Sequence, residues 1–386
     1  MIVTVPKEIS AGERRVALVP STVLQLIQSG LEVVVEAGAG GLSGYPDEDY
    51  ESAGAKIAPS PEAAYGSGDI VVKVVAPAHN QAVGKHEVHL MKEGSTLISL
   101  LFPGSDLDLV GQLADRKIQS FAMELMPRIA RAQAMDVLSS ISSIAGYKAV
   151  LLAANLLPRY FPMMMTAAGT ITPARVLVVG AGVAGLQAIA TARRLGAVVE
   201  AFDIRPIVKE QVQSLGARFV DLPIDTADAQ DAGGYAKEQS ADRQAQIQTL
   251  LAEHVAKSDV VITTALVPGR EAPRLVSGDM VKGMRAGSVI VDLAAEQGGN
   301  CEWTKPGEHV VREGVTIAGP LNLPSELAVH GSDTYSRNLL AYLKHLVHDG
   351  QLQVDLDDEL TKTPLVTRNG EVVHEATLSA ITTGER

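Results

Sequence analysis

The sequence predicts an α/β protein built from two doubly wound, Rossmann-type domains with parallel sheets, joined by a long helix. Two observations lead to this prediction. Short runs rich in valine and isoleucine alternate with amphipathic helical stretches along most of the 386 residues, which is typical of parallel strands connected by helical crossovers. Apolar residues make up 46% of the chain but aromatic residues only 4%, so alanine, valine, leucine and isoleucine must form the cores.

The first series of strands and helices fills the first third of the chain. Its runs follow one another in the order IVTVP, TVLQLIQSG, EVVVEAG, DIVVKVVAP, STLISL, LDLVGQLADRK and IQSFAMELMP. Residues 325–346 form a later helical stretch that we expect to return to this domain. The tail from residue 351 onward is polar with an Asn369-Gly370 turn, and is either a small hairpin or a linker. We therefore assign residues 1–136 and 327–386 to a first α/β domain.

A second series begins at RVLVVGAG and continues through AVVEAFD, ARFVDL, DVVITTAL, SVIVDLA and VTIAG. The alanine-rich segment 128–157 precedes it and predicts a long connecting helix. Residues 137–326 are therefore assigned to a second domain of the Rossmann type.

Charge and composition exclude several classes of function. The formal net charge of -12 argues against a nucleic-acid partner, because phosphate backbones are bound by clustered lysine and arginine. Cys301 is the only cysteine, so neither an intrachain disulfide nor a thiolate zinc cluster can form, and a reducing compartment fits. His79, His86 and His89 lack metal-ligand spacing, and we expect no metal site.

No membrane or export segment is expected either. The opening MIVTVPKEI has the pattern of a strand and shows no secretory signal. The most apolar runs are too short or too interrupted by glycine to span a bilayer. A link to a membrane would therefore come through a partner.

A glycine-rich turn follows the first strand of the second series. Gly180, Gly182 and Gly185 form a G-x-G-x-x-G motif between the apolar run RVLVV and the helical run LQAIATARRLGA, which is the context that dinucleotide binding requires. The first glycine permits a tight turn, the second lets a pyrophosphate approach, and the third lets the helix pack against the strand. With Val183, these glycines are the predicted phosphate site at the start of a helix.

An acidic residue stands about twenty residues further on, at the end of the next predicted strand. Asp203 would accept hydrogen bonds from the adenosine ribose hydroxyls, which selects NAD(H) over NADP(H). Arg205 leaves an alternative open, because an arginine here can hold a 2'-phosphate. The neighbouring carboxylate would repel that phosphate, so we predict NAD(H) as the cofactor.

The polar stretch 225–243 is unusually long for a connection inside an α/β domain. Long connections are more often lids or disordered segments than scaffold. The centre at Gly233, Gly234 and Tyr235 favours a hinged lid with an aromatic tip. A solvated insertion is the alternative.

Several long segments together resemble the NAD(H)-binding component of proton-translocating transhydrogenases. They are PRIARAQAMDVLSS, AGYKAV, FPMMMTAAGT, GAGVAGLQAIATARRLGAVVEAFDIR, AGGYAKE, ITTALVPGREAP and VDLAAEQGGNC. The resemblance runs from Met1 to about Leu346. It implies an oxidoreductase component that passes hydride directly from NADH to NADP+ on the NADP(H)-binding domain of another chain. A membrane-spanning domain on another chain would couple that step to proton translocation.

The resemblance has consequences for assembly as well. It implies a homodimer in the cytoplasm, held peripherally on the cytoplasmic face of the inner membrane by its partner subunits.

The resemblance also implies which residues meet the nicotinamide end of the cofactor: Arg128, Gln133, Asp136 and Ser139, the first three as the candidate catalytic group. Hydride transfer between two nicotinamides needs aligned rings and no strong acid or base. Gln133 can donate and accept hydrogen bonds, while Arg128 and Asp136 can pair to shape the segment. A helix cap with a surface ion pair is the alternative.

By the same resemblance, Tyr235 and Gly234 belong to a mobile lid over the nucleotide. Ala265 and Leu266 would line the adenosine pocket. Simple packing is the alternative for these residues.

Alanine dehydrogenase is a competing interpretation, since Arg15 and Lys73 match the cations that meet the substrate in that family. The segment LLFP, however, has leucines at positions 100 and 101 where those enzymes place a histidine, so the acid–base group for reductive amination is missing. Glu296 also replaces an aspartate. We therefore expect Arg15 and Lys73 to form ion pairs in the first domain's core. A nucleotide-sensing module without chemistry is a third hypothesis, which the RAQAMD segment disfavours.

Overall fold

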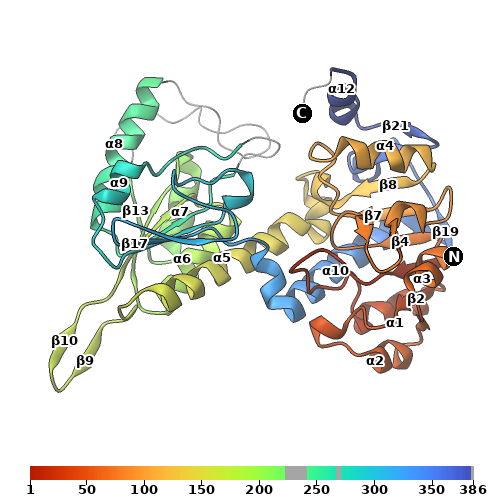
Figure 1. Cartoon of the computed structure of the whole chain (residues 1–386), viewed down its shortest axis with the longest axis horizontal. Coiled ribbons are helices and arrows are strands. Elements are labelled where there is room, and N and C mark those ends of the chain that lie inside the picture. The colour runs from red at the N-terminus through yellow and green to blue at the C-terminus, as the bar shows by residue number, and fades with distance from the viewer. Residues whose placement is uncertain (222–240, 267–270, 384–386) are drawn as a thin grey trace. The chain divides into compact units, whose positions relative to one another are not determined.

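The computed structural model describes residues 1–221, 241–266 and 271–383. Contacts divide the chain into two compact units, Met1–Ile141 with Ser325–Arg386, and Ser142–Pro324 (Figure 1). Gly234, Tyr235 and most of the proposed lid lie outside the described residues, and the last residues of that stretch, 241–243, begin a helix.

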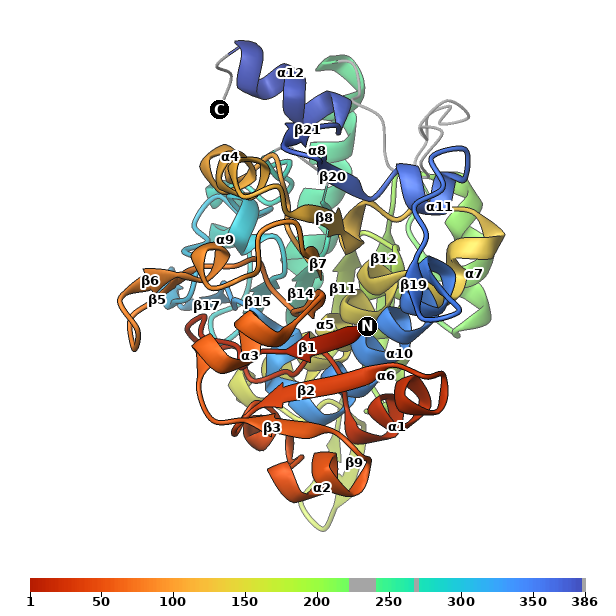
Figure 2. The same cartoon turned by 90° about the vertical axis from the view of Figure 1, so that its right-hand side faces the viewer.

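The first unit contains a sheet of eight strands in the order β21-β20-β8-β7-β4-β1-β2-β3. The strands are β1 (Ile2–Val5), β2 (Glu32–Glu36), β3 (Lys56–Ala58), β4 (Ile70–Val72), β7 (Thr96–Ser99), β8 (Gln119–Ala122), β20 (Leu365–Arg368) and β21 (Glu371–Val372). In the spatial order from β8 to β3, all neighbouring strands are parallel. Figure 2 shows β1, β2 and β3 side by side. Strands β4 and β7 are buried throughout, as expected of parallel strands covered on both faces.

Helices and short hairpins complete this unit. The helices are α1 (Pro20–Gln28), α2 (Asp47–Ser52), α3 (Pro61–Ser67), α4 (Leu107–Asp115), α10 (Ala328–Leu346), α11 (Glu359–Lys362) and α12 (Glu375–Thr383), and the hairpins pair β5 (His79–Asn80) with β6 (Lys85–His86) and β18 (Val347–His348) with β19 (Gln351–Leu352). Helix α10 belongs to this unit, where Tyr335, Leu339 and Leu343 are buried beside Val5 and Val72.

The second unit contains a sheet in the order β13-β12-β11-β14-β15-β17-β16. Its strands are β11 (Arg175–Val179), β12 (Val198–Phe202), β13 (Arg218–Phe219), β14 (Val260–Thr263), β15 (Val289–Asp292), β16 (His309–Arg312) and β17 (Val315–Ala318), and its helices are α6 (Val183–Arg194), α7 (Lys209–Ser214), α8 (Ala241–Lys257) and α9 (Gly278–Lys282). The chain runs outward from β11 in both directions. The boundary between β11 and β14 is therefore the topological switch point, where ligands bind in open α/β sheets.

The predicted α/β fold is confirmed, but neither sheet is wholly parallel. Strand β16 is antiparallel to β17, and β20 pairs antiparallel with both β8 and β21. In the β16–β17 and β20–β21 hairpins, the turn between the two strands causes the reversal. Glu313 and Gly314 have φ of 51° and 76°, and Asn369 and Gly370 have φ of 54° and 88°, so each pair forms the two-residue turn that reverses a strand. The tail after residue 351 thus contains a hairpin, which was one of its two predicted alternatives.

Helix α5 (Val137–Leu156) is the predicted long connecting helix, and the boundary between the units falls within it. By length and composition it is the one helix among the described residues that could cross a membrane. Val137 is nevertheless buried in the core of the first unit, and Ala149, Val150 and Ala153 in a core of the second. Core helices of folded domains meet the same criteria of length and composition.

A hairpin of β9 (Met164–Thr166) and β10 (Gly169–Ile171) extends away from the rest of the second unit (Figure 1). Every residue of both strands is exposed. Met163 and Met165 are 59% and 79% exposed, which is unusual for side chains of this size.

Candidate nucleotide-binding site

The glycine turn lies at the carboxyl end of β11, at the switch point of the second sheet. Gly180 has φ of +100°, and a Cβ there would lie 2.5 Å from Oγ1 of Thr264. Thr264 follows β14, and its backbone N–H donates to the Val179 carbonyl at 2.8 Å. Its hydroxyl donates to the Gly180 carbonyl at 3.1 Å. Only glycine satisfies both the left-handed backbone and the close approach of Thr264.

The other two glycines have different roles. A Cβ on Gly185 would lie 1.9 Å from the carbonyl oxygen of Gly180, so this glycine allows α6 to sit against the turn. A Cβ on Gly182 would meet no atom of the described residues within 4 Å. Gly182 therefore faces open space at the N-terminus of α6, as a residue that lets a phosphate approach must do.

The N-terminus of α6 is suited to an anion. In the described structure no side chain caps this helix at Gly182, and its first turn holds no acidic residue. Val183 is the first helical residue and is partly exposed. The N–H groups of the first turn and the positive end of the helix dipole are thus free to face a pyrophosphate.

Asp203 lies at the end of β12, next to this turn, and is buried. Its carboxylate accepts the N–H of Ala181 at 2.7 Å and the N–H and Nε of Arg205 at 2.9 Å each. Nη2 of Arg205 lies 2.7 Å from the second carboxylate oxygen. The guanidinium is therefore bound to the carboxylate, and a 2'-phosphate would meet an acceptor at this position. This arrangement favours a nucleotide with a free ribose hydroxyl.

The proposed adenosine wall follows β14 directly. Ala265 is half-buried and Leu266 is exposed. Sequence reasoning missed two residues that shape this wall. Thr264 packs on Gly180, and the fully buried side chain of Asn300 bonds to Ala265. The QGGN run in the sequence is the signal that could have drawn attention to Asn300.

The segment predicted to meet the nicotinamide lies in the first unit and joins β8 to α5. It contains two short 3-10 helices, η3 (Met123–Leu125) and η4 (Ala130–Met135), and it exposes Arg128 and Gln133. Asp136 caps α5, since one carboxylate oxygen accepts the N–H of Ser139 at 2.9 Å and the other accepts the Ser139 hydroxyl at 2.6 Å. The cap considered as an alternative is thus present at Asp136. Gln133 remains exposed for other contacts.

Arg15 and Lys73 form ion pairs inside the first unit, as predicted. Lys73 is 0% exposed, with Nζ at 3.1 Å from Glu8 and 3.2 Å from Glu87. Burial acts to lower the pKa of Lys73, but the two carboxylates outweigh burial and raise it. Arg15 lies 2.7 Å from Glu13. These cations are neutralised by the protein's own carboxylates, so a substrate carboxylate would have to compete with them.

The two leucines of LLFP are buried, as expected of packing residues. A carboxyl group nevertheless bonds to the backbone of this segment. Glu124 accepts the N–H groups of Leu101, at 3.0 Å, and of Phe102. Burial raises the pKa of Glu124 to about 7 despite these bonds. Sequence reasoning missed this group because its partners are backbone amides. Glu296, the other departure from alanine dehydrogenases, accepts the N–H of Asn322 at 2.9 Å and so holds a turn.

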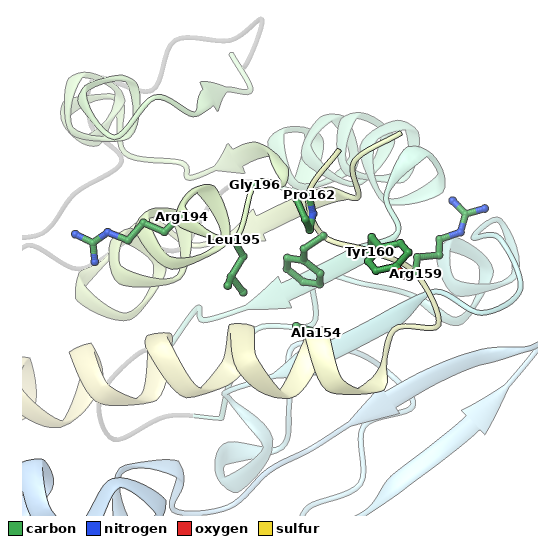
Figure 3. Close-up of a pocket in the computed structure, with 8 residues that line it drawn as sticks. Ala154, Arg159, Tyr160, Pro162, Arg194, Leu195 and Gly196 are labelled. Carbon is green, nitrogen blue, oxygen red and sulfur yellow. The ribbon is translucent and has the colours of Figure 1, made fainter. Parts of the chain in front are cut away.

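A cavity of about 550 Å³ also lies in the second unit (Figure 3). It is lined by residues that precede β11 and β12, including Phe161, Pro162 and Gly196. These residues lie at the amino ends of the strands, whereas the glycine turn lies at the carboxyl end of β11. Figure 3 shows Arg159 and Arg194 pointing away from each other, and Arg159 pairs with Asp259 at 3.0 Å. The cavity therefore presents no convergent charge and is not part of the nucleotide site.

Comparisons with known proteins agree with this geometry. The family descriptions "Alanine dehydrogenase/PNT, N-terminal domain" and "Alanine dehydrogenase/PNT, C-terminal domain" match residues 4–145 and 149–375. The chain is 49% identical over 380 residues to an NAD(P) transhydrogenase alpha-subunit protein of Rhodospirillum rubrum, covering 97% of this chain and 98% of the relative.

Solved structures give the same result. A transhydrogenase from Sinorhizobium meliloti matches with a TM-score of 0.84 and 44% identity, over 97% of this chain and 100% of that one. An L-alanine dehydrogenase matches with a TM-score of 0.80 but only 29% identity, over 99% of each chain.

A glycine turn at the switch point, an uncapped helix N-terminus and an acidic residue at the end of the next strand together define an NAD(H)-binding oxidoreductase component of the Rossmann type. Among such proteins, the chain belongs to the family of NAD(P) transhydrogenase alpha subunits. Alanine dehydrogenases are more distant relatives.

Proposed function

We propose that this chain binds NADH on its second unit and passes hydride directly to NADP+ held by an NADP(H)-binding domain on another chain. A membrane-spanning domain on another chain couples the transfer to proton translocation. The observation that carries the proposal is the glycine turn, where Gly182 faces open space while Gly180 and Gly185 are closely packed.

The nicotinamide supplies the hydride chemistry when the cofactor is bound, and this chain's residues have to hold and orient it. The exposed Gln133 carboxamide can donate and accept hydrogen bonds, and Arg128 is exposed beside it on the same segment. Asp136 and Ser139 bond to each other and fix the end of this segment at the start of α5. We assign Arg128, Gln133 and Asp136 to positioning the nicotinamide, with Ser139 in support.

The geometry of the second unit supports the nucleotide-binding residues that we propose there. They are Gly180, Gly182, Val183 and Gly185 for the pyrophosphate, Asp203 with Arg205 for the ribose, and Ala265 and Leu266 for the adenosine. Gly234 and Tyr235 keep their proposed place on a lid.

We also propose that the chain forms a homodimer and is held on the cytoplasmic face of the inner membrane by its partner subunits. The exposed methionines of the β9–β10 hairpin support the homodimer, because large apolar side chains on a protruding arm are typical of an interaction surface. Met165→Glu should shift the chain toward monomer in sedimentation velocity. A sedimentation coefficient unchanged from that of the wild type would argue against this arm as the dimer contact.

The proposed activity is tested by mixing the purified chain with a purified transhydrogenase NADP(H)-binding domain, NADH and an NADP+ analogue with a distinct absorbance. We expect rapid reduction of the analogue that requires both proteins. A parallel reaction contains the chain alone with NADH, pyruvate and ammonium. Consumption of NADH only in that parallel reaction would instead identify an amino-acid dehydrogenase.

A further inference from the structure

The segment AEQGGN, which follows β15, makes a sharp turn that points Asn300 into the protein. Gly298 and Gly299 have φ of +93° and +85°. A Cβ on Gly299 would lie 2.9 Å from the carboxylate of Asp292. Two consecutive glycines are therefore required to bring the chain back past the end of β15.

Asn300 uses its entire carboxamide to hold the wall that follows β14. Its side-chain oxygen accepts the Ala265 N–H at 3.0 Å, and its side-chain nitrogen donates to the carbonyls of Ala265 and Pro273 at 2.8 Å each. The side chain is 0% exposed. Because the amide is buried and all these groups are paired, breaking the arrangement leaves several buried polar groups without partners.

A buried carboxylate fixes the position of Asn300 itself. Asp292 accepts the hydroxyls of Thr263 at 2.8 Å and Thr304 at 2.6 Å, and the N–H of Cys301 at 3.0 Å. Thr263 is the last residue of β14, and Cys301 follows Asn300. The end of β14 and the base of Asn300 are thus anchored to the same carboxylate.

We infer that Asn300 is a positioning residue for the adenosine half of the nucleotide site, an inference that rests on the proposed NADH site. Both backbone polar groups of Ala265 are occupied by Asn300. Ala265 is therefore left to meet adenosine mainly through its methyl group, next to the exposed side chain of Leu266. The wall recognises a flat apolar face by contact, and its rigidity comes from Asn300.

The test measures dissociation constants of the full chain for NADH, 5'-AMP and reduced nicotinamide mononucleotide. Asn300→Ala should weaken NADH and 5'-AMP binding about tenfold or more, because the wall loses the bonds that fix it. Binding of the mononucleotide and the hydride-transfer rate at saturating NADH should stay within about twofold. The matched control is Asn80→Ala, which removes a buried asparagine from a turn of the first unit, where its side chain accepts the Ala82 N–H at 3.0 Å.

A role in folding alone would lower the melting temperature of Asn300→Ala without changing the affinity for 5'-AMP, and that result would overturn the inference. If the variant does not fold, amide hydrogen exchange of the wild-type chain provides the test. The Ala265 N–H should be protected before any nucleotide is added, whereas rapid exchange in the free chain would also overturn the inference. A wild-type chain that does not bind NADH at all would instead refute the proposed function.

Discussion

The glycine turn of the second unit and the Arg128–Ser139 segment of the first unit are built on opposite principles. In the turn, the backbone forms the site, and side chains are excluded by contacts as short as 1.9 Å from a Cβ to a carbonyl oxygen. In the segment, the proposed contacts to the nicotinamide are made by side chains: Gln133 is exposed on the short 3-10 helix η4, and Arg128 is exposed just before it. The turn is therefore expected to determine whether the nucleotide binds, and the segment how well it reacts.

Gly182→Val tests the first half of this comparison and should have the largest effect. A side chain there would fill the open space above α6, so NADH affinity should fall by about 100-fold or more. The melting temperature should barely change, because a Cβ at this position meets no atom within 4 Å in the described part of the chain. The contrasting variant is Gly185→Ala, whose new methyl would clash with Gly180 and should destabilise the fold. NADH titration followed by fluorescence, together with thermal unfolding, distinguishes the two, and undiminished affinity in Gly182→Val would remove the turn from the site.

Gln133→Asn tests the second half. Shortening the side chain by one methylene should move its carboxamide by about 1 Å and slow hydride transfer by about 10- to 100-fold. NADH affinity should change by less than about threefold, because the turn supplies most of the binding. Single-turnover transfer to the partner domain gives the rate, and equilibrium titration gives the affinity. Equal losses in both measurements would show that Gln133 is an anchor and would weaken the contrast between the two regions.

Asp136 sharpens the comparison because it both caps α5 and belongs to the proposed catalytic group. Asp136→Ala should lower the free energy of unfolding by about 1 kcal/mol through loss of the cap. Asp136→Asn keeps a good capping side chain, so its stability should be close to that of the wild type. Denaturant unfolding measures the first effect and hydride transfer the second. If the Asn variant also transfers hydride at the wild-type rate, the charge of Asp136 has no part in the reaction.

Glu124 lies outside both regions and is expected to affect stability alone. Burial raises its pKa from 4.5 to about 7, so the folded chain holds this proton more tightly than the unfolded chain. The resulting stabilisation is fully present below pH 4.5 and is lost as the pH rises toward 7, by up to about 3 kcal/mol.

Denaturant unfolding at pH 5 and pH 8 should therefore show a larger loss for the wild type than for Glu124→Gln. Burial also raises the pKa of Glu8 and of Glu36, so only the difference between the two proteins is informative. Parallel losses in the two proteins would contradict the assignment to Glu124.

The fold and the glycine turn could be predicted from the sequence because their causes are local. Strand and helix periodicity, the spacing of Gly180, Gly182 and Gly185, and the acidic end of β12 all lie within short windows. The partners of Asn300, Glu124 and Glu8 could not be predicted in this way, because each lies on a segment remote in sequence: Ala265 for Asn300, Leu101 for Glu124 and Lys73 for Glu8. The QGGN run draws attention to Asn300 but does not reveal what it contacts. Asn369-Gly370 indicated the hairpin of β20 and β21 as one alternative, but the pairing of β20 with β8 and the antiparallel strand β16 were missed, since the pattern of a parallel core does not indicate how its edges are closed.

Asp203 carries a consequence for cofactor choice. The same carboxylate that disfavours a 2'-phosphate also holds the Ala181 N–H of the glycine turn and both the backbone and the guanidinium of Arg205. Exchanging it for a residue without a side-chain acceptor would release the arginine from this ion pair and, in the same step, loosen the turn proposed to hold the pyrophosphate. The proposed exclusion of a 2'-phosphate and the shape of the proposed phosphate site therefore depend on the same carboxylate.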